Sequence, residues 1–190
     1  MKGKSVNVED MNASFSLSLR EKVASLIRDV PDFPQAGVLY RDITPLLADG
    51  DTFSSLIKEF AQLYEGKIDA VAGLDARGFI LASPIAAQLG VGMIAVRKAG
   101  SLPGPVIGTD YSLEYGTARF ELHDFTVKKN QRILIVDDVL ATGGTAGAAV
   151  QLIERAGADV AGLCFLLELK VLKGREGLLG DYDVQILCVL

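Results

Sequence analysis

Apolar positions along this chain repeat with helical spacing in four segments, at about residues 18–30, 52–64, 79–89 and 144–156. The first segment opens with the capping-box spacing of Ser18 and Glu21, and Pro31 is expected to stop its helix. A glycine follows each of the other three segments, at positions 66, 90 and 157, and glycine is common where helices end. The pattern therefore predicts four amphipathic helices.

Short apolar runs alternate with these helices, at residues 70–74, 93–96 and 132–136. They lack polar alternation, which is typical of strands buried on both faces of a parallel sheet. Residues 109–123 differ, because polar and apolar positions alternate there as in a half-exposed strand. We predict an α/β fold with a central, mainly parallel sheet flanked by helices, and a hairpin or flap.

Composition indicates one compact domain. The chain has 190 residues, of which 49% are hydrophobic, enough to bury about 70% of the surface that the unfolded chain exposes. Residues 1–15 are polar and lack periodicity, so we expect a mobile N-terminal arm. Residues 16–190 are then a single domain.

Charge and residue usage exclude several classes of function. A net charge of −5 and a pI near 4.9 argue against nucleic-acid binding. No apolar stretch reaches the roughly 18 residues of a membrane span, and the N-terminus lacks a signal-peptide pattern, so we expect a cytoplasmic protein without a membrane partner. Cys164 and Cys188 are expected to be free buried thiols, and a single histidine, His123, leaves no material for a histidine-based triad.

The most specific signal follows the run 132–136. Asp137 and Asp138 come at its carboxyl end, where parallel strands carry ligands, and carboxylates can accept hydrogen bonds from a vicinal diol. A small-residue loop then opens the next helix: Ala141, Thr142, Gly143, Gly144 and Thr145. Such a loop lets backbone N–H groups approach an anion closely. The order predicts a ribose 5-phosphate site; the alternative is a structural glycine turn with surface aspartates.

Charged residues also follow the two other predicted strands. Arg77 lies between a strand and a helix and could hold a second phosphate group with its forked donors, whereas an ion pair with Asp75 is the alternative. Arg97 and Lys98 follow the next strand. They are expected to neutralise phosphate, although a solvated surface loop would also explain them.

Residues 133–145 resemble the phosphoribosyl pyrophosphate motif of the type I phosphoribosyltransferases. Further segments resemble the members of that family that act on adenine: 31–34 with 37–43, 73–79, 111–116, and 167–169 with 173–175. The similarity covers nearly the whole chain after the arm. It implies the type I phosphoribosyltransferase fold with a small N-terminal hood. It also implies transfer of phosphoribosyl from phosphoribosyl pyrophosphate to adenine, giving AMP and pyrophosphate.

The resemblance implies a role for each predicted strand end. The ribose hydroxyls are assigned to Asp137 and Asp138, and the 5-phosphate to the loop 141–145. Pyrophosphate is implied to meet a set of residues after the first two strands: Asp75, Ala76, Arg77, Arg97 and Lys98. The family has an unusual peptide between the first two of these.

The resemblance also implies where adenine binds. Backbone groups of Leu39 and Arg41 are expected to meet the edge of the base, and Tyr40 and Leu169 to enclose its faces. Because this contact set matches the adenine enzymes, it favours adenine over the other purine bases.

Two residues, Glu114 and Tyr115, match the closing flap of the family. By spacing alone Glu114 is an ordinary solvated glutamate, but the resemblance makes it a candidate for proton transfer and places Tyr115 near phosphoribosyl pyrophosphate. Arg77 is the second candidate catalytic residue, because an arginine beside pyrophosphate would stabilise its developing charge.

Partners and cofactor follow from the same resemblance. Magnesium is implied as the cofactor, held mainly through phosphoribosyl pyrophosphate and without a direct protein ligand, and a homodimer is expected. Two alternatives remain open. One is a phosphoribosyltransferase for another purine base, and the other is a non-catalytic regulatory protein that senses phosphoribosyl pyrophosphate.

Overall fold

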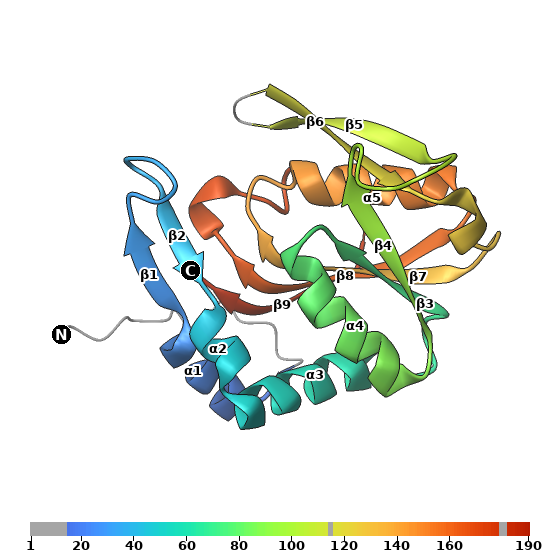
Figure 1. Ribbon diagram of the computed structural model, residues 1–190. Coiled ribbons are helices and arrows are strands. Elements are labelled where there is room, and N and C mark those ends of the chain that lie inside the picture. The colour runs from blue at the N-terminus through green and yellow to red at the C-terminus, as the bar shows by residue number, and fades with distance from the viewer. Residues whose placement is uncertain (1–14, 114–115, 179–181) are drawn as a thin grey trace.

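The computed structural model describes residues 15–113, 116–178 and 182–190 of the chain. The parallel strands of its central sheet are β3 (Ala70–Leu74), β4 (Gly92–Lys98), β7 (Arg132–Leu140), β8 (Asp159–Glu168) and β9 (Val184–Val189). The antiparallel strands β5 (Ile107–Leu113) and β6 (Gly116–Leu122) extend one edge, in the order β5-β6-β4-β3-β7-β8-β9 (Figure 1). The predicted mainly parallel sheet with a hairpin is confirmed.

Helices cover both faces of this sheet (Figure 1). They are α1 (Leu17–Leu26), α2 (Thr44–Ala48), α3 (Gly50–Tyr64), α4 (Arg77–Leu89) and α5 (Gly144–Arg155), with short 3₁₀ turns at η2 (Asp124–Thr126) and η3 (Lys170–Leu172). A separate antiparallel pair, β1 (Arg28–Pro31) and β2 (Leu39–Asp42), forms the hood hairpin. Among the described residues, no helix combines the length and apolarity needed to cross a membrane.

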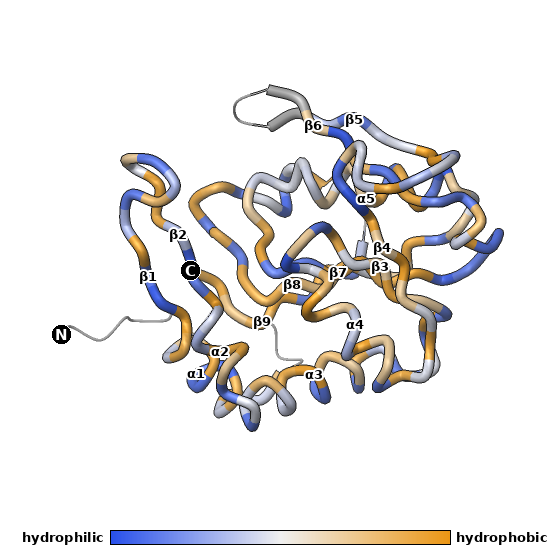
Figure 2. Tube along the Cα trace, in the orientation of Figure 1, coloured by the Kyte–Doolittle hydropathy of each residue, from blue (hydrophilic) through white to orange (hydrophobic). Residues whose placement is uncertain are grey.

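The core divides into two layers because strand residues alternate between the two faces. In β7, Leu134 and Val136 pack with residues of α1, α3 and α4, whereas Ile133 and Ile135 pack with residues of α5. All four side chains are fully buried, and β8 and β9 beside them are largely hydrophobic (Figure 2). Burial on both faces of the sheet thus explains the unbroken apolar run of β7, as predicted.

The prediction that the first helix continues to Pro31 is wrong, because the helix ends at Leu26. Residues 28–31 form β1 instead, which pairs with β2 so that Val30 lies opposite Tyr40. Ile27 is already extended, although its side chain remains buried. A helical repeat of apolar residues continues across this point in the sequence, but pairing with the next strand, β2, determines the backbone.

The predicted capping box is also wrong. The helix begins at Leu17, so Ser18 lies inside it, and its N-cap Ser16 makes no side-chain cap hydrogen bond. The hydroxyl of Ser16 donates to Glu59 of α3 at 2.6 Å instead. A contact between helices thus replaces the expected local one.

The other elements whose bounds the sequence predicted agree with the structure to within two residues, with one exception that affects the site. No bounds were predicted for β2, α2, β8 and β9. The strand predicted at 132–136 continues to Leu140, because parallel pairing with β8 persists to Leu140, opposite Glu168. Asp137 and Asp138 therefore lie inside a strand and not after it. The cysteines are free and buried, as predicted.

Only one residue of the predicted N-terminal arm, Phe15, lies within the described residues. Residues 1–14 of the predicted arm lie outside the described residues. Phe15 is buried, and its ring meets that of Phe60 edge-on, with the centroids 5.0 Å apart.

We expect Phe60→Ala to lower the free energy of unfolding by about 3–5 kcal/mol, because it removes a fully buried ring from the core. Urea denaturation measures this loss. Phe125→Ala is the matched control, since that ring is 74% exposed and surface changes usually cost less than about 0.5 kcal/mol. Similar losses in the two variants would contradict the assignment of Phe60 to the core.

Candidate active site

The carboxyl ends of β4, β3 and β7 lie side by side at one edge of the sheet, because these strands are parallel neighbours. Asp75 follows β3, Arg97 lies at the end of β4, and Asp137 and Asp138 lie near the end of β7. The structure thus brings together residues that the sequence placed after three separate strands. This edge is where open α/β sheets bind ligands. We call the surface around these residues the cleft.

Asp75 and Arg97 form an ion pair across two of these strand ends. The distance from Arg97 Nε to Asp75 Oδ2 is 2.8 Å, and the backbone N–H of Lys98 donates to the same oxygen at 3.4 Å. Burial raises the pKa of Asp75, but the hydrogen bonds and charges of Arg97 and Lys98 outweigh it, and the pKa is lowered. The peptide between Asp75 and Ala76 is cis, in agreement with the unusual peptide that the resemblance implies.

Arg77, the first residue of α4, joins the sheet to the hood hairpin. Its Nε lies 2.8 Å from Asp138 Oδ2, and its Nη1 donates to the hydroxyl of Tyr40 at 3.1 Å and to the carbonyl of Arg41 at 3.3 Å. The guanidinium also lies over the ring of Tyr40, 5.1 Å from its centroid. The ion pair of Arg77 is therefore with Asp138, whereas Asp75 pairs with Arg97.

The two aspartates of β7 meet different surroundings. Asp138 is 4% exposed, and its Oδ2 accepts no hydrogen bond from the described residues although it is paired with Arg77. Asp137 is half-buried and accepts a hydrogen bond from the N–H of Asp138 at 2.9 Å. Burial and the charge of Asp138 raise the pKa of Asp137 well above its usual value. Burial also raises the pKa of Asp138, against the opposing charge of Arg77.

The flap strand β5 carries a residue that sequence reasoning missed. Burial, followed by the charges of Asp137 and Asp75, raises the pKa of Tyr111. Tyr111 also stacks on Phe120 of β6, with ring centroids 4.9 Å apart. The alternation in residues 109–123 predicted a strand, but it did not indicate which face of that strand would lie toward the cleft.

The small-residue loop 141–145 leads from β7 into α5. Gly143 is the N-cap residue and has a φ of 86°, a left-handed conformation that glycine adopts without strain. The first turn of the helix contains no acidic side chain. The helix begins at Gly144, as the sequence predicted, and free N–H groups and the positive end of the dipole at such a helix start favour an anion.

One edge of the hood hairpin faces the cleft. The carbonyl of Arg41 accepts from Arg77, so it points away from β1. Backbone groups two residues apart in a strand face the same edge, and Leu39 therefore presents its N–H and C=O there as well. Pro31 lies opposite Leu39 in β1, at a position where its missing N–H costs no hydrogen bond.

Leu169 lies directly after β8 and adjoins the end of β7. Its N–H donates to the carbonyl of Leu140 at 3.0 Å. Tyr40 also connects to β7, through Arg77 and Asp138. The two residues predicted to enclose adenine thus both adjoin the strand that carries the aspartates.

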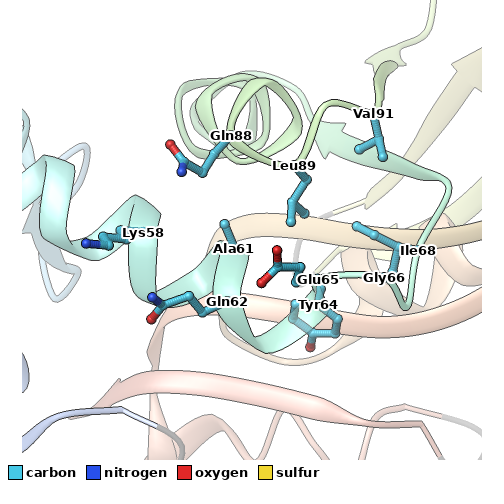
Figure 3. Close-up of a pocket in the computed structure, with 10 residues that line it drawn as sticks. All are labelled: Lys58, Ala61, Gln62, Tyr64, Glu65, Gly66, Ile68, Gln88, Leu89 and Val91. Atoms are coloured by element: carbon cyan, nitrogen blue, oxygen red, sulfur yellow. The ribbon is translucent and has the colours of Figure 1, made fainter.

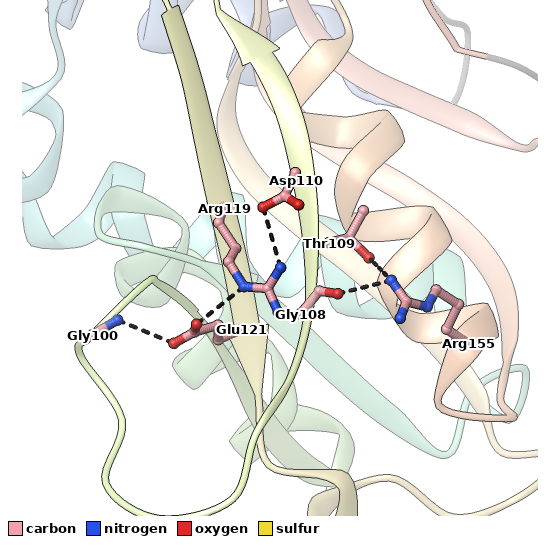
Figure 4. Close-up of polar contacts among 7 residues, drawn as sticks. All are labelled: Gly100, Gly108, Thr109, Asp110, Arg119, Glu121 and Arg155. Atoms are coloured by element: carbon pink, nitrogen blue, oxygen red, sulfur yellow. Dashed lines mark hydrogen bonds and ion pairs between the residues drawn. The ribbon is translucent and has the colours of Figure 1, made fainter.

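The base of the flap is fixed to α5. Arg155 donates from Nη1 to the carbonyl of Gly108 at 2.8 Å and to the hydroxyl of Thr109 at 3.2 Å (Figure 4). A hollow between β5 and α5, lined in part by Tyr111 and Gly144, opens beside the small-residue loop. Glu114 and Tyr115 lie outside the described residues.

The flap is also connected to the segment after β4. Arg119 of β6 lies between Asp110 and Glu121, 3.2 Å from each carboxylate. The other oxygen of Glu121 accepts from the N–H of Gly100 at 3.1 Å (Figure 4). The predicted pyrophosphate residues Arg97 and Lys98 are therefore followed by a loop that is bonded to the flap.

A second hollow lies between the C-terminal ends of α3 and α4 (Figure 3). Its lining includes Glu65, and also Ile68 and Val91, which precede β3 and β4. It is therefore at the amino edge of the sheet, opposite the aspartates, and none of the predicted site residues that the structure describes lines it. The carboxyl edge remains the candidate active site.

The family model of the phosphoribosyl transferase domain matches residues 44–185. The match runs from α2 into β9 and includes every strand end of the cleft. The fold is therefore that of a phosphoribosyltransferase.

Individual relatives narrow this class. The chain is 52% identical over 160 residues to the adenine phosphoribosyltransferase of Streptomyces clavuligerus, which covers 84% of this chain and 90% of that protein. A crystal structure of adenine phosphoribosyltransferase from Rhodothermus marinus has a TM-score of 0.88 at 40% identity, covering 92% of this chain and 100% of the other. The Saccharomyces cerevisiae structure has a TM-score of 0.85 at 36% identity, with 90% and 98% covered. The chain belongs to the adenine phosphoribosyltransferase family.

We expect Asp137→Asn to raise the stability of the protein at neutral pH. Because the pKa of Asp137 is raised in the folded state, its contribution to stability is present below the unfolded pKa of about 3.9 and is lost as pH rises through the folded pKa. The advantage of the variant should therefore shrink as pH falls from 7.5 toward 4. Urea denaturation across this range measures it.

Asp69→Asn is the control of opposite sign. Hydrogen bonds from Arg132 lower the pKa of Asp69 to about 2, so its contribution is present above the unfolded pKa and is lost as pH falls toward 2. This variant should be less stable than the parent at neutral pH. If both variants changed stability in the same direction, the assigned electrostatics of Asp137 would be wrong.

Proposed function

We propose that this protein makes AMP and pyrophosphate from adenine and phosphoribosyl pyrophosphate in the cleft at the carboxyl edge of its sheet. The observation that carries the proposal is the position of Arg77, which pairs with Asp138 of β7 and donates to the backbone of the hood. The same strand, β7, leads into the small-residue loop at the start of α5. The S. cerevisiae structure is complexed with adenine and an imino-altritol 1,6-bisphosphate, which supports a base site next to a sugar-phosphate site.

The ribose 5-phosphate half of the substrate is assigned to β7 and the start of α5. Asp137 and Asp138 accept hydrogen bonds from the ribose hydroxyls, and Asp138 is held in place by the ion pair of its Oδ2 with Arg77 Nε at 2.8 Å. The 5-phosphate is held by backbone N–H groups and hydroxyls of the loop: Ala141, Thr142, Gly143, Gly144 and Thr145. Each charge-assisted hydrogen bond is worth roughly 1.5–3 kcal/mol.

Pyrophosphate is assigned to the ends of β3 and β4: Asp75, Ala76, Arg77, Arg97 and Lys98. Among the described residues no group of three or more acidic, histidine or cysteine side chains could hold a metal ion. Magnesium often keeps few protein ligands and binds substrate phosphates, so here it would be held mainly through phosphoribosyl pyrophosphate. When bound, magnesium neutralises charge on the pyrophosphate oxygens.

Adenine is assigned to the outward edge of β2, between Tyr40 and Leu169. A backbone N–H and C=O of Leu39 and Arg41 match the ring nitrogen and exocyclic amine of adenine, because one is a donor and the other an acceptor. A 6-oxo purine presents the reverse order and would leave buried groups unsatisfied, at about 1–3 kcal/mol each. This mismatch is the proposed basis of selection against hypoxanthine and guanine.

The reaction breaks the bond from ribose C1 to a pyrophosphate oxygen and forms the bond from C1 to N9 of adenine. Negative charge develops on the leaving pyrophosphate, where the guanidinium of Arg77 stabilises it. The proton of N9 must then leave, and Glu114 of the flap is the proposed acceptor. Tyr115 is proposed to meet phosphoribosyl pyrophosphate when the flap closes and excludes water.

Two further expectations stay predictions, namely assembly as a homodimer and a cytoplasmic location. The homodimer comes from the family resemblance, and the location from the lack of a membrane-span stretch and of a signal-peptide pattern in the sequence. The alternative of a non-catalytic phosphoribosyl pyrophosphate sensor that regulates by binding nucleic acid is disfavoured by the net charge of −5, because such a protein would need a basic face.

The direct test is pyrophosphate release from phosphoribosyl pyrophosphate and magnesium with adenine, hypoxanthine, guanine or xanthine. We expect release with adenine, together with equimolar AMP. Release with another base but not with adenine would contradict the proposed base site. Binding of phosphoribosyl pyrophosphate without release for any base would instead support the sensor.

We expect Arg77→Ala to lower kcat by about 10²–10³-fold, as for the loss of one transition-state donor, with a much smaller rise in KM for adenine. Steady-state kinetics with each substrate varied separately measures both. Tyr40→Phe is the matched variant, because it removes only the hydroxyl that accepts from Arg77 and should change kcat little. A large rise in KM for adenine at unchanged kcat would limit Arg77 to positioning the hood.

A further inference from the structure

A turn near the C-terminus, residues 173–178, packs directly against the loop that begins α5; we call it the backing turn. A methyl group placed on Gly174 would lie 2.4 Å from the carbonyl oxygen of Ala141, and one on Gly177 would lie 2.2 Å from that of Thr142. Real Cβ atoms do not approach heavy atoms closer than 3.0 Å. The two segments are thus in backbone-to-backbone contact that only glycine permits.

The contact is reciprocal. A methyl group on Gly143 would lie 2.3 Å from the carbonyl oxygen of Gly174, and Gly143 also has a φ of 86°. Glycines on both sides therefore allow the two backbones to approach. In the sequence, the loop glycines alone predicted an anion site, whereas Gly174 and Gly177 carried no such signal.

The direction of the carbonyl groups determines the direction of the donors. In a trans peptide the C=O and the N–H point to opposite sides. Because the carbonyls of Ala141 and Thr142 point at the backing turn, the N–H groups of Thr142 and Gly143 in the same two peptides point away from it. The side of the loop that presents these two N–H groups therefore carries neither of these two carbonyl oxygens.

The backing turn is itself held to the end of β8. Arg175 donates from Nε to the two carboxylate oxygens of Glu168 at 3.1 and 3.3 Å, and Glu168 is buried at the last position of the strand. Leu178 at the end of the turn is buried in the core layer of α5. The turn is therefore anchored to the sheet independently of the loop that it contacts.

We propose that the backing turn is a positioning element for the 5-phosphate. Gly174 and Gly177 fix the peptide orientation at 141–143, so that the N–H groups of Thr142 and Gly143 face the phosphate of phosphoribosyl pyrophosphate and of AMP. A side chain at either glycine displaces the carbonyls and turns these donors. The proposal rests on the proposed function, because it assumes that the loop binds this phosphate.

The test compares Gly174→Ala and Gly177→Ala with Gly147→Ala, a control in α5 where an added methyl meets nothing closer than 3.9 Å. We expect both test variants to raise KM for phosphoribosyl pyrophosphate by about tenfold or more, the equivalent of one charge-assisted hydrogen bond. KM for adenine should stay unchanged. The control should match the parent.

A second measurement separates positioning from general damage. In calorimetric titrations, AMP should lose affinity in the test variants by the same factor as phosphoribosyl pyrophosphate, whereas adenosine, which lacks the phosphate, should not. Equal losses for AMP and adenosine would overturn the proposal. So would unaltered AMP binding in folded Gly174→Ala and Gly177→Ala proteins.

If the glycine variants do not fold, Arg175→Met tests the same turn without adding atoms at the contact. It removes the anchor to Glu168 and should weaken AMP but not adenosine; unaltered AMP binding would overturn the proposal. A parent protein that makes no AMP would refute the proposed function itself. A parent that makes AMP while the variants bind it normally would refute only the backing turn.

Discussion

The ion pair between Arg77 and Asp138 is the contact on which the arrangement of the cleft depends. A carboxylate as buried as Asp138 requires a close partner, because the desolvation of an uncompensated charge is strongly destabilising. Arg77 provides the charge, and with the same guanidinium it binds Tyr40 and the backbone of Arg41. One side chain therefore sets the distance between the strand that carries the aspartates and the hood.

The acidic residues of this edge are held in opposite electrostatic conditions. Hydrogen bonds and charges from Arg97 and Lys98 keep the pKa of Asp75 low, whereas burial and the neighbouring charge of Asp138 raise the pKa of Asp137. A raised pKa means that the protein alone stabilises the ionised carboxylate poorly. Carboxylates with such strongly shifted pKa values are typical of functional sites. The small-residue loop differs, because it offers backbone dipoles and no charge.

Much of the fold followed from local pattern. The apolar runs of β3 and β7 and the amphipathic repeats of α3 and α4 were visible because burial on two faces, or on one stripe, leaves a direct trace in composition. The prediction failed where pairing between two strands decided the backbone, because the pattern within one segment does not show its pairing partner. Residues 28–31 became a strand because β2 lies beside them, and β7 lengthened because β8 continues alongside it.

The sequence by itself determined which residues are the candidates for the chemistry, since the aspartates, the small-residue loop and the helix start are contiguous and their order alone predicts a sugar-phosphate site. Only the tertiary structure decided which partners those residues take. Arg77 pairs with Asp138 and not with Asp75, and Gly174 lies against Ala141. Such partners come from strands and turns far apart in the chain, and strand order in the sheet, which local pattern does not encode, brings them within reach.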